Sequence, residues 1–159
     1  MERSQILKRI LVTGASGQLG LSLQDIAPQY SDLEFLFKKS TELDITDEEK
    51  VNNIFKTGRF DYCINCAAYT KVEEAEKNPE MAFKVNAEAV RYLAEACTIQ
   101  NTTLIHISTD FVFDGAKTTP YTEEDLPNPI NVYGKSKWEG EKYIQEILDR
   151  YFIVRTSWL

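Results

Sequence analysis

The sequence predicts an α/β fold in which helices pack on both faces of a parallel sheet, the doubly wound arrangement. Short apolar runs alternate with segments of helical periodicity along the chain. The first apolar run leads into three glycines spaced G-x-x-G-x-x-G. With 159 residues, 43% of them hydrophobic, the chain is long enough to bury one core. We therefore expect one domain over residues 1–159.

The first predicted strand, residues 9–13, runs directly into a loop that contains Gly14, Gly17 and Gly20. Gly14 permits a sharp turn, Gly17 leaves room for phosphates, and Gly20 lets a helix pack closely on the sheet. The helix expected over residues 18–27 directs its free N–H groups and its positive dipole end at this loop. The pattern predicts a binding site for a nucleotide pyrophosphate, with simple turn chemistry as the alternative.

Residues 33–37 form a second apolar run, which we expect to be a strand, and residues 43–45 a further short extended piece. A capping box follows, in which Thr46 caps a helix and Glu49 reaches back to its start. We expect this helix to end at Gly58. Its apolar face consists of Val51, Ile54 and Phe55.

The second half of the chain continues the alternation of strand and helix. Its expected elements are a buried strand over residues 62–68, a helix opened by Asn78 and Pro79, a strand over 103–108, a loop over 114–129, a helix over 131–150 and a strand over 152–157. The long helix carries an apolar stripe formed by Ala82, Val85, Ala89, Leu93 and Ala96.

The three cysteines are Cys63, Cys66 and Cys97, of which the first two form a C-x-x-C pair. Such a pair is typical of redox or metal chemistry. In a strand, however, positions i and i+3 face opposite sides of the sheet, and the chain has no second ligand pair for zinc. We therefore interpret the cysteines as small buried hydrophobic residues and predict no metal site.

Charge and the chain ends restrict the functional classes. A net charge of −7 argues against nucleic acid as a partner, because phosphate backbones favour basic surfaces. The sequence has no apolar run of about 18 residues and no signal-peptide pattern, so we expect a cytoplasmic protein without a membrane partner. The last residues, 155–159, end on two large apolar side chains, from which we expect the front part of a longer protein; a short natural chain is the alternative.

A tyrosine and a lysine, Tyr133 and Lys137, are spaced i and i+4 in the last predicted helix and so share one face. Moving a phenol pKa from about 10 to about 7 takes roughly 4 kcal/mol. An ammonium about 4 Å away supplies on the order of 4 kcal/mol at an effective dielectric of 20. The pair could thus make the phenol a usable acid or base, although a solvated helix surface gives the same spacing.

Hydroxyl and carboxyl side chains lie at the carboxyl end of the strand that precedes that helix. Thr109 could hydrogen-bond a substrate oxygen beside the tyrosine, and Asp110 could accept from a substrate hydroxyl. The alternative is capping of the strand end by these polar residues. His106, the only histidine, has an isoleucine on each side and is interpreted as a core residue rather than a catalyst.

Six motifs together resemble the dTDP-4-dehydrorhamnose reductase family of the extended short-chain dehydrogenases. They are Gly-Ala-Ser-Gly-Gln-Leu-Gly (14–20), Leu-Asp-Ile-Thr-Asp (43–47), Asn-Cys-Ala-Ala-Tyr-Thr (65–70), Ser-Thr-Asp-Phe-Val-Phe-Asp-Gly (108–115), Tyr-Gly-Lys-Ser-Lys (133–137) and Arg-Thr-Ser-Trp (155–158). The motifs occur in the family's order, and the resemblance covers the N-terminal portion of the family. It implies a Rossmann-like cofactor domain whose C-terminal substrate lobe lies beyond residue 159.

The resemblance also implies the roles of individual residues. The catalytic residues would be Thr109, Tyr133 and Lys137. The cofactor would contact Gly14, Gly17, Gln18, Leu19, Gly20, Asp44, Ile45, Ala67, Ala68, Tyr69, Thr70, Ile107, Tyr133 and Lys137. The sugar nucleotide would contact Thr109, Asp110 and Trp158. The implied reaction transfers a hydride to a C4 ketone of a dTDP-sugar while Tyr133 donates the proton.

The sequence departs from the family's usual pattern at Phe111, where tyrosine is usual, and at Glu73, where aspartate is frequent. At the end of the second strand, Lys38 and Lys39 replace the acidic residue that selects NAD, which favours NADPH with NADH tolerated. A solvated surface is the alternative for these lysines. In some family members Mg²⁺ lies at a subunit contact, but no residue here identifies such a site; the resemblance leaves a homodimer open.

Two other functions fit the same motifs. One is a different sugar-nucleotide reductase or epimerase of the superfamily, and an epimerase consumes no cofactor. The other is a non-catalytic regulatory subunit, because a relative of these reductases regulates a methionine adenosyltransferase. Even if the reductase assignment holds, the expectation is that residues 1–159 alone bind cofactor better than they turn over substrate.

Overall fold

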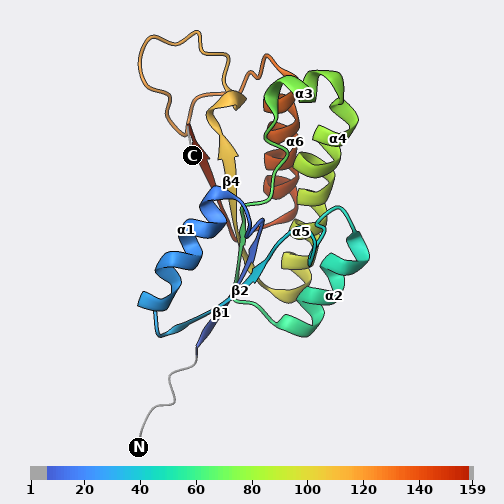
Figure 1. The fold of residues 1–159 in the computed structure, drawn as a ribbon. Helices are drawn as coiled ribbons and strands as arrows, with labels where there is room; N and C mark the ends of the chain where they lie inside the picture. The colour runs from blue at the N-terminus through green and yellow to red at the C-terminus, as the bar shows by residue number, and fades with distance from the viewer. Residues whose placement is uncertain (1–6, 158–159) are drawn as a thin grey trace, which may run out of the picture.

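The computed structural model describes residues 7–157, in which five strands form one parallel sheet in the order β2-β1-β3-β4-β5 (Figure 1). The strands are β1 (Lys8–Thr13), β2 (Leu33–Lys38), β3 (Tyr62–Asn65), β4 (Thr103–Thr109) and β5 (Tyr151–Thr156). All neighbouring pairs are parallel. After β1 the chain forms β2 on one side of β1, and it then adds β3, β4 and β5 on the other side. This reversal creates a crevice at the carboxyl ends of β1 and β3, where doubly wound folds bind ligands.

Helices cover both faces of the sheet, which confirms the predicted fold class. Figure 1 shows α1 (Gln18–Ile26) on one side and α2 (Glu48–Gly58), α5 (Ala89–Gln100) and α6 (Val132–Ile147) on the other. Right-handed crossovers explain this division, because the β1-to-β2 connection runs in the opposite direction to the later ones. The short elements are η1 (Ala27–Gln29), α3 (Val72–Lys77), α4 (Pro79–Phe83), η2 (Lys84–Glu88) and η3 (Asp110–Val112).

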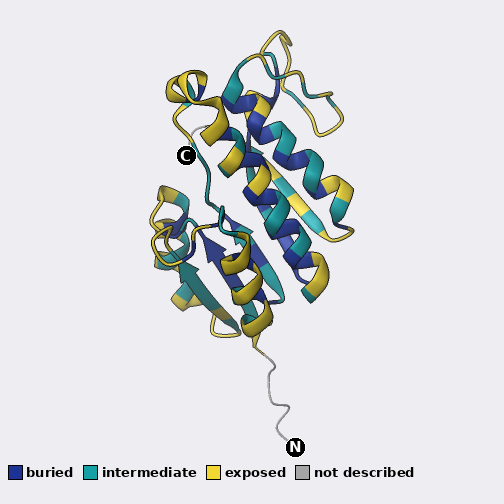
Figure 2. Ribbon diagram, turned by 90° about the vertical axis from the view of Figure 1, so that its right-hand side faces the viewer, coloured by how far each residue is buried: buried dark blue, intermediate teal, exposed yellow. Residues whose placement is uncertain are grey.

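The main hydrophobic core lies between the sheet and the layer formed by α2, α5 and α6. The strand register places Leu11, Cys63 and Leu104 side by side on this face, and all three are fully buried. The helices contribute Val51, Phe55, Val90, Leu93 and Ile144. Figure 2 shows the buried residues of these helices on the sides that face the sheet. The helical stripes read from the sequence therefore point where the periodicity predicts.

The start of α2 differs from the prediction by one residue. The helix is capped by Asp47, whose carboxylate accepts a hydrogen bond from the Lys50 N–H at 3.1 Å. The Thr46 hydroxyl, which was expected to be the cap, donates instead to Asp44 Oδ1 at 2.8 Å. Residues 43–45 are not a strand; their two apolar side chains are buried in the core while the backbone stays outside the sheet. The apolar residues at positions 43 and 45 therefore reflect burial in the core and not membership of a strand.

Three further elements differ from the prediction by more than one residue. The third strand ends at Asn65 rather than at residue 68, because the chain leaves the sheet at the crevice. The helix opened by Pro79 contains a π-helical turn, η2, that joins α4 to α5. The last helix ends at Ile147 rather than at residue 150. Helix α3 was not predicted.

The cysteines are free. Cys63 and Cys97 are fully buried as predicted, whereas Cys66 is half-buried and lies just beyond the end of β3, outside the strand that was expected to contain it. The neighbouring Cys97 thiol and burial raise the pKa of Cys63 well above its usual value. Burial raises the pKa of Cys66 to about 12. Both groups are therefore neutral thiols at physiological pH, which does not suit thiolate redox chemistry.

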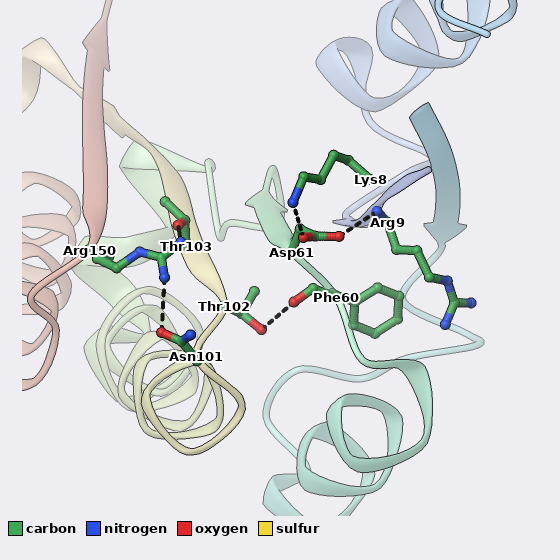
Figure 3. A network of polar contacts seen from close by, with 8 residues as sticks. All are labelled: Lys8, Arg9, Phe60, Asp61, Asn101, Thr102, Thr103 and Arg150. Atoms are coloured by element: carbon green, nitrogen blue, oxygen red, sulfur yellow. Dashed lines mark hydrogen bonds and ion pairs between the residues drawn. The ribbon is translucent and has the colours of Figure 1, made fainter. Parts of the chain in front are cut away.

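Polar contacts tie the amino-terminal ends of the strands together (Figure 3). The Asp61 carboxylate accepts from Lys8 Nζ at 2.7 Å and from the Arg9 N–H at 2.9 Å. Thr102 donates to the Phe60 carbonyl at 2.8 Å and so links the start of β4 to the start of β3. This end of the sheet is closed by its own side chains, and the functional residues gather at the other end.

Candidate active site

The glycine loop lies against the segment that follows β3. Gly14 has a φ of +66°, a left-handed conformation that favours glycine. A Cβ atom at Gly14 would lie 2.5 Å from the Ala67 backbone nitrogen, and one at Gly20 would lie 2.6 Å from the Gly14 carbonyl oxygen. Both glycines are therefore required by close backbone approach. The loop and residues 66–67 form one wall of the crevice.

The start of α1 fits an anion. Gly17 is the N-cap residue, and it provides no side chain to cap the N–H groups of the first turn. Its exposed Cα faces open space, since an added Cβ would meet only the Gly14 carbonyl, at 3.3 Å. The first N–H groups of α1, those of Gln18, Leu19 and Gly20, are thus available to phosphate oxygens. These residues fit the pyrophosphate of a dinucleotide.

Tyr133 and Thr109 meet at the carboxyl end of β4. Tyr133, in the first turn of α6, is 9% exposed, and its ring packs edge-on against Phe111 with the centroids 5.5 Å apart. Burial raises the pKa of Tyr133; the nearby Thr109 side chain acts in the opposite direction, and the negative charge of Asp110 adds to the rise. The phenol is therefore protonated at neutral pH, which suits a proton donor.

Lys137 is almost completely buried one turn after Tyr133. Its Nζ donates to the Ile107 carbonyl at 2.7 Å and lies 3.5 Å from His106 Nε2. Burial lowers the pKa of Lys137 to about 8, and the negative charge of Glu141 opposes this shift.

The expected effect of this lysine on the tyrosine is not seen, because Lys137 is not among the groups that shift the pKa of Tyr133. Its amine is directed inward, to the Ile107 carbonyl, rather than toward the phenol. The i, i+4 spacing fixes a shared helix face but not where the end of a long side chain points.

Asn86 is a site residue that the sequence analysis missed. It is buried in the π-helical turn and its amide holds both backbone groups of Tyr69, at 2.8 Å and 2.9 Å. It also donates to the Ser136 hydroxyl, which in turn donates to the Tyr133 carbonyl. The residue thereby connects the predicted cofactor segment to the first turn of α6. A polar residue within an otherwise apolar helical stripe was the available signal.

A buried ion pair, also missed, joins α6 to β5. The Glu141 carboxylate is fully buried and accepts from the Ser108 hydroxyl and from Arg155, whose Nη2 lies 2.6 Å from Oε2. The guanidinium also lies over the Phe113 ring, 5.1 Å from its centroid. This pair fixes the side of α6 that carries Lys137, one turn away.

The other predicted cofactor residues lie at the same edge of the sheet with different exposures. Lys38 Nζ is 3.9 Å from Glu42 Oε1, and Lys39 is exposed. Asp44 is exposed, whereas the Ile45 side chain is buried in the core. Residues 67–69 are half-buried and Thr70 is exposed, while Asp110 is exposed beside the tyrosine. Trp158, a predicted substrate contact, lies outside the described residues.

Residues 7–157 contain neither a cluster of metal-binding side chains nor a membrane-spanning helix. Within that range no group of three or more His, Cys, Asp or Glu side chains could hold a metal ion. Over the same residues no helix is both long enough and apolar enough to cross a bilayer.

Known sequences resemble the chain over nearly its whole length. Residues 8–159 match the family described as the RmlD substrate binding domain. A dTDP-4-dehydrorhamnose reductase of Aggregatibacter actinomycetemcomitans is 43% identical over 152 residues, which are 96% of this chain and 52% of the relative. The same-named protein of Sinorhizobium fredii is 42% identical over 95% of this chain and 50% of its own. The chain spans about half the length of the curated relatives it matches.

Solved structures give the same picture. A dTDP-4-dehydrorhamnose reductase from Bacillus anthracis, crystallised with NADP, superposes with a TM-score of 0.92 and 41% identity, over 96% of this chain and 54% of that one. A UDP-glucose 4-epimerase from Thermus thermophilus, solved with NAD, superposes with a TM-score of 0.82 at 24% identity, over 92% of this chain and 54% of that one. The second likeness shows the shared fold alone.

Proposed function

The chain belongs to the RmlD substrate binding domain family, and on that premise we propose that it is the dinucleotide-binding part of a dTDP-4-dehydrorhamnose reductase. The whole protein reduces the C4 ketone of dTDP-4-dehydro-L-rhamnose to dTDP-L-rhamnose, a precursor of surface polysaccharide. It uses NADPH, with NADH tolerated, and acts in the cytoplasm on a dTDP-sugar.

The observation that carries this proposal is the position of the buried Tyr133 ring against Phe111, two residues after Thr109, at the carboxyl end of β4. Contacts connect the helix of Tyr133 to the glycine loop. The backbone of Gly14 approaches Ala67, whose N–H donates to Asn65. Asn65 leads through His106 to Lys137. A phenol, a hydroxyl and an anion-binding helix start thus share one crevice. That arrangement suits reduction of a carbonyl with a dinucleotide.

The cofactor, when bound, supplies a hydride to the ketone carbon. Tyr133 donates the proton of its hydroxyl to the ketone oxygen, for which its raised pKa keeps it protonated. Thr109 donates a hydrogen bond to the same oxygen and orients the carbonyl. Lys137, whose pKa is lowered to about 8, holds the ribose of the nicotinamide half. The first turn of α1 binds the pyrophosphate.

The full-length protein tests the proposal directly. Incubation with NADPH and a dTDP-4-keto-6-deoxy sugar is followed at 340 nm and by the sugar product. We expect one NADPH oxidised for each ketone reduced. An epimerase would convert sugar without net oxidation, and a regulatory subunit would oxidise none, so either result would reject the reductase.

We predict that Gly17→Ala weakens cofactor binding without weakening the fold. The added methyl group has room in the protein, since it meets only the Gly14 carbonyl at 3.3 Å, but it occupies the space assigned to phosphate. We expect a dissociation constant for NADPH raised by about tenfold, roughly 1.4 kcal/mol, with an unchanged Tm. Fluorescence titration and thermal denaturation of the full-length protein measure the two effects. If Gly17→Ala bound NADPH with wild-type affinity, the pyrophosphate would not bind at this turn.

We also predict that the double variant Lys38→Ala/Lys39→Ala loses affinity for NADPH at least about fivefold more than for NADH. Two ammonium groups favour the 2′-phosphate that only NADPH carries. Lys56→Ala, an exposed lysine on α2, is the matched control and should change neither affinity. Equal losses for the two cofactors would show that the lysines do not read the phosphate.

A further inference from the structure

A chain of buried polar side chains crosses three strands and ends at Lys137. The Thr13 hydroxyl donates to Asn65 Oδ1 at 2.6 Å, Asn65 Nδ2 lies 3.0 Å from His106 Nδ1, and His106 Nε2 lies 3.5 Å from Lys137 Nζ. All four residues are at least nine-tenths buried. The sequence analysis placed His106 in the core, and it is fully buried there. Its neighbours, however, determine which of its ring nitrogens donates a hydrogen bond and which accepts one.

The direction of the hydrogen bonds follows from a backbone group. The Ala67 N–H, which can only donate, lies 3.2 Å from Asn65 Oδ1, and the Thr13 hydroxyl donates to the same oxygen. The Asn65 amide therefore has its oxygen toward Ala67 and its NH₂ group toward His106. Since that NH₂ group donates to Nδ1, Nδ1 carries no proton. The neutral imidazole then carries its proton on Nε2, the nitrogen that faces Lys137.

His106 is a neutral donor under ordinary conditions. Burial, and then the positive charge of Lys137, lower the pKa of His106 well below its usual value. An Nε2–H can donate to the lone pair of an uncharged amine, whereas it opposes an ammonium. The Ile107 carbonyl accepts from Nζ in either state, at 2.7 Å.

The remaining titratable groups around Lys137 come from several elements. Glu141 on α6 favours the charged lysine, and Arg155 of β5 pairs with Glu141 and offsets part of its effect. Cys66, after β3, is a neutral thiol at the pH where the lysine titrates. Among the described residues, His106 on β4 is the titratable side chain that lies within hydrogen-bonding distance of Nζ, at 3.5 Å. It is thus the group placed to act on the amine itself.

We propose that His106 is a positioning residue: held in the Nε2–H form by Asn65, it fixes the Lys137 amine in the crevice and donates a hydrogen bond to its uncharged state. Its effect on turnover rests on the proposed function, because Lys137 matters to catalysis only if the crevice binds the nicotinamide ribose. The tautomer and the titration of the lysine do not depend on that function, and they are measured without turnover.

The first experiment determines the tautomer. Long-range ¹H–¹⁵N spectra of ¹⁵N-histidine-labelled full-length protein report which ring nitrogen is protonated, and the resonance that disappears in His106→Gln identifies residue 106. We expect a protonated Nε2 and an unprotonated Nδ1 at neutral pH. An Nδ1–H form, or an imidazolium at neutral pH, would overturn the proposal.

The second experiment measures the titration of Lys137 by ¹³C NMR of labelled lysine Cε, with Lys137→Arg used to identify the resonance. His106→Phe keeps a ring but removes the donor, and we expect the Lys137 pKa to rise by about half a unit to one unit. His106→Gln can place an acceptor toward Asn65 and a donor toward the amine, so it should restore the wild-type titration. Leu104→Ala, a fully buried residue on the same strand and face, is the control for lost packing.

Equal titration shifts in His106→Phe and Leu104→Ala would mean that His106 acts only through packing, and would overturn the proposal. Should His106→Phe fail to fold, Asn65→Asp tests the proposal by reversing the tautomer. A carboxylate there accepts from Nδ1–H, so the ring proton should move from Nε2 to Nδ1 in the ¹⁵N spectra; a ring that keeps its proton on Nε2 would overturn the role given to Asn65. If the protein proves not to be a reductase, these spectra still decide the role of His106.

Discussion

Replacing Tyr133 by phenylalanine will lower kcat for ketone reduction in the full-length protein by at least about a hundredfold, since general acid catalysis contributes roughly 10²–10⁴. The substitution removes one oxygen and keeps the ring that packs edge-on against Phe111. The proton donor is lost with that oxygen, and Thr109 alone remains to orient the carbonyl. The affinity for NADPH should change by less than about twofold, because one hydroxyl is a small part of the contacts implied for the cofactor.

Steady-state kinetics and a fluorescence titration separate these two effects. Tyr143→Phe, the same substitution on α6 ten residues further along, is the matched control and should leave kcat within about twofold. If Tyr133→Phe kept near wild-type turnover, the phenol would not be the proton donor. If both kcat and cofactor affinity collapsed together with the Tm, the residue would be structural.

Replacing Arg155 by methionine will destabilise the protein by about 3–5 kcal/mol, the usual cost of leaving one member of a buried pair without its partner. Glu141 is fully buried, and three of its contacts with Arg155 lie between 2.6 Å and 3.2 Å. Without the guanidinium, the Ser108 hydroxyl is the one side-chain donor left for the carboxylate among residues 7–157. The methionine keeps much of the apolar stem but provides no charge.

Urea denaturation of the full-length protein, with α6 followed by hydrogen exchange, measures this loss. Lys142→Met removes the partner of Glu139 on the same helix, in an exposed pair, and should cost less than about 1 kcal/mol. The double variant Arg155→Met/Glu141→Met should recover part of the loss, because it no longer buries a lone charge. An effect of Arg155→Met no larger than that of Lys142→Met would show that the buried carboxylate is not destabilised by losing its partner.

The sequence predicts the architecture well because the apolar periodicity is local. The stripe on the long helix after Pro79 and the run at residues 103–108 lie where the periodicity places them. Gly14 and Gly20 were assigned a turn and a close helix contact, and both are needed for the close backbone approach that the structure shows. The roles of the site residues stay predictions until the variants above are measured.

Local signals failed where two of them competed. Thr46 and Asp47 both cap helices well, and the choice depended on the Asp44 carboxylate that takes the Thr46 hydroxyl. Residues 43–45 have the apolar pattern of a strand, but the segment does not pair with the sheet, whose edge strand on this side is β2. Its apolar side chains pack into the core instead.

The sequence by itself determined the alternation of elements, the glycine turn and the helix face shared by Tyr133 and Lys137, since each depends on spacing along the chain. Only the tertiary structure decided which way Lys137 points, which proton His106 carries and that Arg155 lies against Glu141. Those contacts join residues brought together by the packing of separate strands and helices. Hydrogen bonds in a buried site are selected by geometry in three dimensions, and one-dimensional periodicity carries no information about it.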